Sequence, residues 1–358
     1  MCRNAEPFFP LSLFWYSSFI FHSFKGMLMA INTLFKKEIA SDSGKLMAKQ
    51  RRFAYTSLAP ILLYMGLFTL FPIVWAVVMS FFSYTPIREG SGFLGLGGAN
   101  PFIGIDNYIE LFTGTSKPAE VFRLAVKNTF LFTALVLPLN LLVTLPLAVI
   151  LESIGDRFKT LFRAIYFLPT ISSSVALVII WSYMYAPGWG MLSLIFKAVG
   201  LVPPKSWLQD PNTVYFGIPL AMLCVVIAHV WQDFGYNLVI FVAALQSIPK
   251  TLREAARVDG ANPWQEFWLV VVPLLSRTVL LTSVLTVISS LQVFVIFQLL
   301  TRGGPKNQTQ TMLLSIYENA FKFANNLGLS AAMSMILFII ILVLTVTQFK
   351  ILRTEWEY

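Results

Sequence analysis

The chain has 358 residues, of which 57% are hydrophobic and only 12% are charged. Soluble domains carry about 25% charged residues, so the composition excludes a soluble protein and indicates an integral membrane protein. The net charge of +9 could suggest nucleic-acid binding, but the basic residues lie mostly in loops on one predicted side of the membrane, which indicates topology. The two cysteines, Cys2 and Cys224, are too few for a disulfide framework and lack metal-site spacing.

Residues 1–53 are predicted to form an N-terminal cytoplasmic segment. Its apolar run, residues 8–21, is shorter than the roughly 20 residues that span a bilayer, and no small-residue cleavage site follows it. An interfacial helix and a misassigned start both fit this run, and in the second case translation begins at Met27 or Met29. The six lysines and arginines between residues 36 and 52 are typical of a cytoplasmic segment.

Six long apolar stretches predict an all-α, polytopic membrane protein with six transmembrane helices. They cover residues 58–82, 128–151, 164–185, 214–245, 267–300 and 328–349. The segments then placed inside the cell hold 16 lysines and arginines, against 9 in the segments placed outside. This asymmetry predicts that both termini are cytoplasmic. The predicted division is a first helix with its external loop (54–123), a transmembrane domain (124–350) and a cytoplasmic tail (351–358).

A polar segment separates the fourth and fifth predicted helices. Residues 250–258 read as a short helix, and Gly260 suits the left-handed position that ends one. Asn262 is a good N-cap for a second helix, with Pro263 at its first position and Gln265 placed to complete a capping box. The sequence therefore predicts a helix, a sharp turn and a second helix that enters the membrane.

The same segment carries a spaced motif, which combines an acidic residue, two alanines, a glycine, two aliphatic residues and a proline. The motif residues are Glu254, Ala255, Ala256, Gly260, Val270, Val272 and Pro273. This pattern resembles the EAA loop, here at residues 250–273, of permease subunits of binding-protein-dependent ABC importers, in particular the carbohydrate-uptake branch. Valine replaces both aliphatic residues of the family pattern, which is a mild departure.

Two further segments resemble the same family. FIGIDNY at residues 102–108 follows the first predicted helix, and TRGGPKNQT at residues 301–309 follows the fifth. Both are similar to loops of the maltose-permease F and glycerol-3-phosphate-permease A type. The resemblance covers roughly residues 58–352.

The resemblance implies the type I ABC importer permease fold and the uptake of a sugar or related polar solute by alternating access in the bacterial cytoplasmic (inner) membrane. It implies as partners a second permease subunit in a heterodimer, two cytoplasmic ATPase subunits, an extracytoplasmic solute-binding protein and membrane lipid, but no nucleic acid. It also implies that the EAA loop couples the permease to the ATPase. The coupling residues are then Glu254, Ala255, Ala256, Asp259, Gly260 and Pro273.

Polar side chains form one helical face in each of the fourth and fifth predicted helices. The first stripe is His229, Gln232, Asp233, Tyr236 and Asn237, and the second is Thr282, Thr286, Ser289 and Ser290. Ionisable groups at membrane depth usually face a pathway, so the stripes could line a solute cavity, with Trp231 or Tyr236 stacking on a sugar. The alternative is that these groups hydrogen-bond helices together.

The sequence contains no motif of an enzyme or a metal site. It has no HExxH, no serine-hydrolase elbow and no GxxxxGK[ST] phosphate loop, so we expect no catalytic residues, no metal and no cofactor, and ATP hydrolysis on another subunit. His229 and Asp233 leave open an ion-coupled secondary transporter that uses them as a relay, and a membrane scaffold is a third alternative. The EAA loop argues against both.

Overall fold

The computed structural model describes residues 44–86, 98–154, 156–323 and 326–351. The predictions about the interfacial helix, the start at Met27 or Met29 and the tail at 352–358 lie outside these residues. The chain forms two compact units, Met1–Phe71 and Pro72–Tyr358, which are considered separately.

The described part of the first unit is helical. Helix α2 (Gly44–Met65) contains Pro60 and continues as the π-helix η2 (Gly66–Leu70). A proline is tolerated in membrane helices more readily than in soluble ones. The large apolar side chains along this helix are exposed, as expected of a helix that faces lipid.

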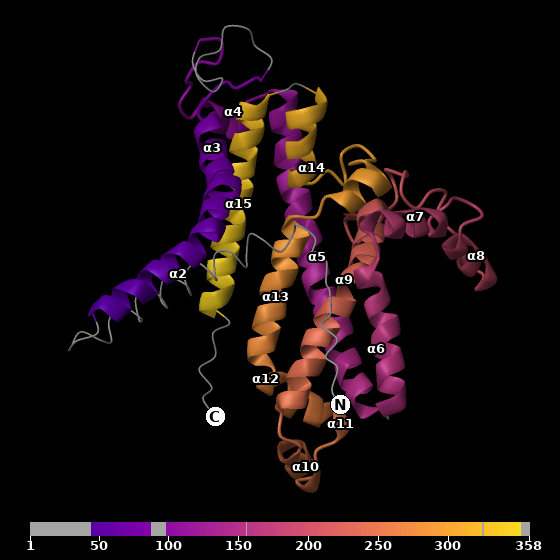
Figure 1. Ribbon diagram of the computed structural model, residues 1–358. Coiled ribbons are helices and arrows are strands. Elements are labelled where there is room, and N and C mark those ends of the chain that lie inside the picture. The colour runs from indigo at the N-terminus through magenta and orange to yellow at the C-terminus, as the bar shows by residue number, and fades with distance from the viewer. Residues whose placement is uncertain (1–43, 87–97, 155, 324–325, 352–358) are drawn as a thin grey trace. The chain divides into compact units, whose positions relative to one another are not determined.

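The second unit is a bundle of long helices with shorter helices at its ends (Figure 1). Its first half comprises α3 (Phe71–Met79, beginning at the last residue of the first unit), α4 (Asp106–Thr113), α5 (Lys117–Ser153), α6 (Asp156–Ile171), α7 (Ser174–Met184), α8 (Met191–Ala198), β1 (Val214–Tyr215) and β2 (Ile218–Pro219). Its second half comprises α9 (Leu220–Ser247), α10 (Lys250–Val258), α11 (Pro263–Gln265), η4 (Glu266–Val271), α12 (Val272–Leu274), α13 (Ser276–Leu291), η5 (Phe297–Thr301), α14 (Met312–Tyr317), η6 (Glu318–Phe323) and α15 (Leu327–Ile351). Helices α10 and α14 lie at opposite ends of the bundle.

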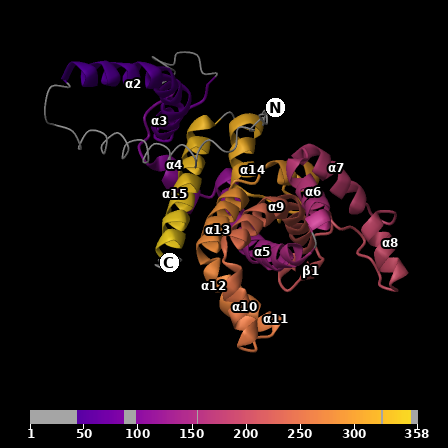
Figure 2. The same cartoon turned by 60° about the horizontal axis from the view of Figure 1, so that its bottom comes forward.

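Four helices in the described residues are long and apolar enough to cross a membrane, and two bent helix pairs raise the number to six. Each bent pair falls within a stretch that the sequence predicted as one continuous transmembrane helix. The third predicted helix breaks between α6 and α7, which meet at 97°, and the fifth breaks between α12 and α13 at 74°. Pro169 lies in the last turn of α6, where a proline disfavours a regular continuation of the helix. Figure 2 shows α7 and α8 extending away from α5 and α9.

The predicted ends of three helices were also wrong. Residues 214–219 form a β-hairpin rather than the start of the fourth helix, because Phe216 and Gly217 both have positive φ in the turn between β1 and β2. The fifth predicted helix, taken as far as residue 300, already ends with α13 at Leu291. The second predicted helix begins eleven residues early, where the Ser116 side chain caps α5. The segment between the fifth and sixth predicted helices, residues 301–327, contains α14 and η6.

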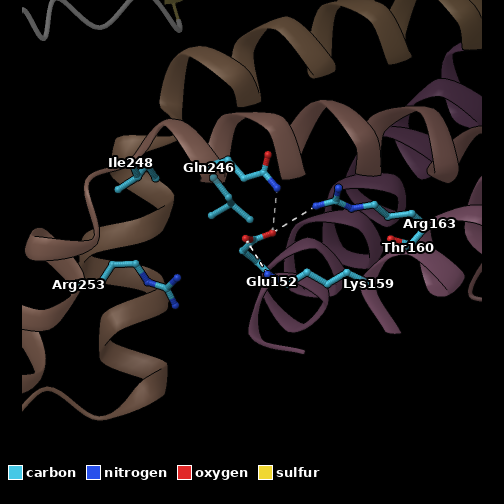
Figure 3. Close-up of a pocket in the computed structure, with 8 residues that line it drawn as sticks. Glu152, Lys159, Thr160, Arg163, Gln246, Ile248 and Arg253 are labelled. Atoms are coloured by element: carbon cyan, nitrogen blue, oxygen red, sulfur yellow. Dashed lines mark hydrogen bonds and ion pairs between the residues drawn. The ribbon is translucent and has the colours of Figure 1, made fainter. Parts of the chain in front are cut away.

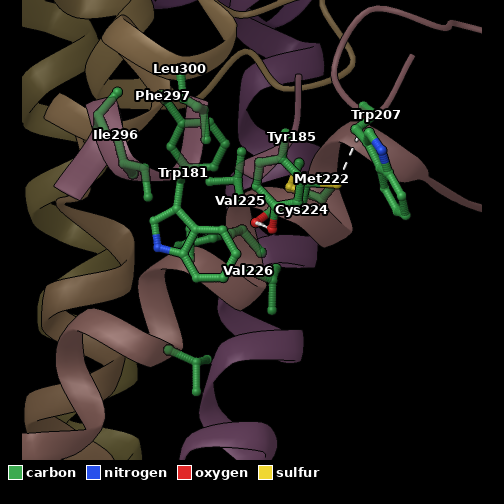
Figure 4. Close-up of a cluster of buried hydrophobic side chains, with 14 of the residues drawn as sticks. Trp181, Tyr185, Trp207, Met222, Cys224, Val225, Val226, Ile296, Phe297 and Leu300 are labelled. Carbon is green, nitrogen blue, oxygen red and sulfur yellow. Dashed lines mark hydrogen bonds between the residues drawn. The ribbon is translucent and has the colours of Figure 1, made fainter. Parts of the chain in front are cut away.

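An aromatic cluster forms the core at the end of α9 that is distant from α10 (Figure 4). It gathers Trp181, Tyr185 and Trp207 against the start of α9. The hydroxyl of Tyr185 donates a hydrogen bond to the Cys224 carbonyl oxygen (2.9 Å), and the Trp207 Nε1 donates to Ser193 Oγ (2.8 Å). Buried aromatic side chains usually satisfy their polar atoms in this way. The thiol of Cys224 is free and buried.

Side chains of the FIGIDNY segment, residues 102–108, form hydrogen bonds that hold α4 against the residues at the end of α3. Asn107 Nδ2 donates hydrogen bonds to the carbonyl oxygens of Ser80 (2.8 Å) and Phe82 (3.1 Å). The Tyr108 hydroxyl bonds to Ser80 Oγ at 2.7 Å. The segment therefore satisfies backbone groups that the end of a helix leaves without partners.

The TRGGPKNQT segment folds as a compact loop that contacts two other parts of the chain. Arg302 and Asn307 adopt positive φ, which allows the backbone to reverse direction. Asn128 Nδ2 on α5 donates to the Asn307 carbonyl oxygen (2.8 Å), and Gln308 Nε2 donates to that of Pro211 (3.0 Å). The loop thus connects α5 with the segment that precedes the hairpin.

Helices α6 and α9 approach closely at Gly235. A Cβ atom there would clash with the carbonyl oxygen of Tyr166 and lie 2.7 Å from Thr170 Oγ1. The Thr170 hydroxyl donates a hydrogen bond to the Gln232 carbonyl oxygen (2.9 Å). This bond also requires the backbones of α6 and α9 to lie close together. The glycine is required by close backbone contact.

We therefore expect Gly235→Val to lower the free energy of unfolding by about 2–3 kcal/mol, because the two backbones must separate. Thermal unfolding of the purified chain in detergent measures this. Ile227→Leu, on an exposed position of the same helix, is the control and should leave the transition unchanged. An unchanged transition for Gly235→Val would show that α6 is free to move.

Candidate functional site

The predicted helix at residues 250–258 is confirmed as α10, and it ends as the sequence indicates. Gly260 has φ of +86°. The amide of Ala261 donates to the Ala256 carbonyl oxygen (3.0 Å), and the amide of Gly260 donates to that of Arg257 (3.1 Å). These two bonds define a Schellman motif, which requires the left-handed conformation that glycine adopts most readily.

The predicted capping box is also confirmed. The Gln265 amide donates to Asn262 Oδ1 (2.8 Å), while the Asn262 amide donates to Gln265 Oε1 (2.9 Å). Pro263 occupies the first helical position. The turn between α10 and α11 is therefore fixed by local hydrogen bonds on both sides.

Two arginines paired with one buried carboxylate, which we call the arginine clasp, join α10 to η4. Arg253 Nε donates to Glu266 Oε1 (2.6 Å), and Arg257 Nε donates to Glu266 Oε2 (2.7 Å). The Glu266 side chain is only 5% exposed. Its hydrogen bond raises the pKa of Arg257, which therefore stays charged. The sequence reasoning missed the clasp, although Arg253 and Arg257 lie one helical turn apart and so share a face.

The side chains of α10 that take no part in the clasp are mostly exposed. Glu254, Ala255 and Asp259 are exposed, as is Val258 at 87%, and Ala256 is partly buried. Pro273 is exposed at the start of α12. The clasp thus holds one face of α10 against η4, and the face with the small alanines remains accessible.

The two predicted polar stripes meet within the bundle. Asn237 Nδ2 donates to Thr286 Oγ1 (3.0 Å) and to Asn140 Oδ1 (2.8 Å), and Asn140 Nδ2 donates to Asp233 Oδ2 (3.3 Å). A second bond joins Ser290 on α13 to Thr133 on α5 (3.0 Å between the hydroxyls). These two sets of hydrogen bonds join α5, α9 and α13, and together we call them the polar network.

Other stripe residues lie outside this network. Gln232 Nε2 donates to Ser174 Oγ on α7 (2.9 Å), so it faces α6 and α7 instead. Thr282 and Ser289 hydrogen-bond to carbonyl oxygens of their own helix. Tyr236 is half-buried.

The ring of His229 lies 5.2 Å from that of Phe132, measured between centroids. His229 Nε2 is buried without a hydrogen-bond partner. No group of three histidine, cysteine or carboxylate side chains in the described part of the chain could hold a metal ion.

The sequence reasoning missed the contribution of α5 to the network. Thr133, Asn140 and Thr144 follow each other at i, i+7 and i+11, so they lie on one face of the helix. All three side chains are buried. That spacing was a readable signal, but only the fold shows that this face meets α9 and α13.

The fold and site together define a polytopic membrane transport component: membrane-length helices around a polar network, with a rigid helical turn exposed at one end. Comparison with known proteins gives the family. A family model described as a binding-protein-dependent transport system inner membrane component matches residues 144–352. The chain belongs to this family and is a permease of an ABC transport system, not an enzyme.

Similar proteins agree with this assignment. A probable ABC transporter permease of Pyrococcus horikoshii is 33% identical over 80% of this chain and 90% of its own length. The lactose transport system permease protein LacF of Rhizobium radiobacter is 31% identical over 82% of this chain and 92% of its own length. A chain of a bacterial ABC transporter involved in the import of the acidic polysaccharide alginate matches 87% of this chain and all of its own, with a TM-score of 0.70 at 20% identity. This last match shows the same fold.

Proposed function

We propose that this permease imports a sugar or related polar solute across the inner membrane by alternating access, driven by ATP that separate subunits hydrolyse. The observation that carries the proposal is the polar network of α5, α9 and α13, which places amide, hydroxyl and carboxylate groups within apolar helices. Such groups match the donors and acceptors of sugar hydroxyls. The name of the Rhizobium radiobacter relative, a lactose permease, supports the same substrate class.

The pathway in this proposal runs along the faces of α9 and α13. Its residues are His229, Asp233, Tyr236, Asn237, Thr286, Ser289 and Ser290, and Gln232 extends it from α9 toward α7. Asp233 accepts one hydrogen bond, at 3.3 Å, from Asn140. A carboxylate can accept several hydrogen bonds, so Asp233 keeps capacity for a solute hydroxyl. His229 and Asp233 are also the basis of the ion-coupled alternative, which membership of an ABC permease family disfavours.

Coupling in this proposal passes through α10. Its exposed alanine face docks in a groove on a cytoplasmic ATPase subunit, and Glu254 meets a basic residue there. The arginine clasp then transmits the movement of α10 to η4, α12 and α13, which continue into the polar network. The full assembly contains a second permease subunit, two ATPase subunits and an extracytoplasmic solute-binding protein, with both termini of this chain in the cytoplasm.

The pathway is tested by Asp233→Ala. Losing a hydrogen bond to a charged acceptor should lower transport by roughly 10- to 100-fold while leaving assembly with the ATPase unchanged. Uptake into liposomes, divided by the amount of assembled complex, measures this. Ser182→Ala is the control, because Ser182 on α7 lies outside the network and donates to the Val178 carbonyl oxygen of its own helix. If the complex dissociates while uptake per remaining complex is normal, Asp233 holds helices together and does not contact solute.

A further inference from the structure

A cavity of about 450 Å³ lies beside α10, and apart from Arg253 its lining residues have no role in the mechanism proposed above. Its polar lining comes from the end of α5, the start of α6, the end of α9 and α10 (Figure 3). The polar residues are Glu152, Lys159, Thr160, Arg163, Gln246 and Arg253. We call it the basic pocket.

Cationic side chains outnumber carboxylates three to one in the lining of the basic pocket. Glu152 is its single carboxylate, and it already accepts from Lys159 Nζ (3.1 Å) and Gln246 Nε2 (3.5 Å). Arg163 Nη2 lies 3.5 Å from Glu152 Oε2, but Arg163 Nε and Nη2 are buried without a hydrogen bond. Arg253 binds Glu266 through Nε. The pocket therefore offers hydrogen-bond donors and positive charge to an anion.

An apolar groove continues from the basic pocket along α9. This second cavity has a volume of about 120 Å³ and shares Arg163 and Gln246 with the first. The rest of its lining is Leu238, Val239, Val242 and Ala243. Val239 and Ala243 are exposed, so the groove is open to the surroundings of the helix. A cationic pocket that leads into an apolar groove matches a molecule with an anionic head and an apolar tail.

We propose that these two cavities bind an anionic phospholipid, with its phosphate in the basic pocket and an acyl chain along Val239 and Ala243. Basic pockets between helices on the cytoplasmic side of membrane proteins suit such headgroups. The pocket lies beside α10, so its location on the cytoplasmic side rests on the proposed function, in which α10 docks on a cytoplasmic ATPase. Since Arg253 belongs to both the pocket and the arginine clasp, a bound headgroup would contact a residue that joins α10 to η4.

Native mass spectrometry of the full-length chain in detergent tests the proposal without any transport assay. The chain is titrated with phosphatidylglycerol and with phosphatidylcholine of the same acyl composition. We expect phosphatidylglycerol to be retained at least fivefold more tightly. Arg163→Gln and Lys159→Gln should each weaken its binding by about fivefold, which corresponds to one cation near an anionic lipid. Lys205→Gln, an exposed change in the segment between α8 and β1, is the matched control and should have no effect.

Ala243→Trp tests the groove separately, because it fills an exposed position and leaves the basic pocket intact. It should weaken phosphatidylglycerol binding by a similar factor, while inorganic phosphate in excess should displace the lipid poorly. Equal retention of the two lipids, or normal binding by the Arg163 and Lys159 variants, would overturn the proposal. Ready displacement by inorganic phosphate together with normal binding by Ala243→Trp would show a site for free anions instead. If the assembled wild-type transporter took up no sugar while the chain still bound phosphatidylglycerol as expected, the result would count against the proposed function and not against the lipid site.

Discussion

Replacing Ala256 with aspartate should abolish recovery of the ATPase subunit with the purified permease. Ala256 is partly buried on α10, next to the exposed Ala255. A carboxylate at this position would hold the docking surfaces apart and would lose its hydration on binding. Burying such a group without a partner costs about 3 kcal/mol or more, which weakens binding at least a hundredfold. Co-purification of the ATPase with the tagged permease measures the effect.

Ala256→Ser is the matched control for this variant. Serine is nearly as small as alanine, and its hydroxyl can bond to a carbonyl oxygen of its own helix, so recovery of the ATPase should stay near the wild-type level. Membrane insertion should be normal for both variants, because no transmembrane residue changes. Wild-type recovery for Ala256→Asp would remove the assignment of α10 as the coupling helix.

Breaking the arginine clasp with Glu266→Ala should uncouple ATP hydrolysis from transport even where the ATPase still binds. The change leaves Arg253, whose side chain is 25% exposed, without its carboxylate partner. Losing the hydrogen bond between Arg253 and the buried Glu266 carboxylate should cost about 1–3 kcal/mol, whereas Arg257, which is 60% exposed, becomes hydrated instead. Helix α10 would then move without η4, so hydrolysis should continue while solute uptake falls. The ratio of the two rates in liposomes is the measurement.

Glu318→Ala provides the matched control for the clasp. Glu318 pairs with Lys322 at 3.1 Å but lies on η6, at the other end of the bundle from α10. Glu318 also accepts a hydrogen bond from the buried Gln310 Nε2 (2.8 Å), so its loss should cost about 1–3 kcal/mol and leave the ratio of hydrolysis to uptake unchanged. An unchanged ratio in Glu266→Ala would show that the clasp only supports the local fold.

The sequence was most informative where the structure depends on local interactions. The bounds of α10, the positive φ of Gly260 and the capping box at Asn262 all follow from hydrogen bonds within a few residues. Such bonds are encoded by the residues that form them, so spacing alone predicted them. The family motif lies in the same segment, which is why the class of protein could be predicted without the fold.

The sequence was least informative where one helix depends on another. The bends between α6 and α7 and between α12 and α13 interrupt apolar stretches that look continuous in composition. Asn140 was overlooked because its partners, Asp233 and Asn237, lie more than ninety residues away. Glu266 was overlooked because a single carboxylate near two arginines has no distinctive pattern. Contacts of this kind depend on packing, which hydropathy and periodicity do not describe.

The central claim, that α10 docks on a cytoplasmic ATPase, is tested most directly by photo-crosslinking in the assembled transporter. A photoreactive phenylalanine analogue at the exposed Ala255 should form a covalent adduct with the ATPase subunit. The same probe at Phe216, which is fully exposed on the hairpin between β1 and β2, should form none. An adduct from position 216, or the absence of one from position 255 in an intact complex, would contradict the account.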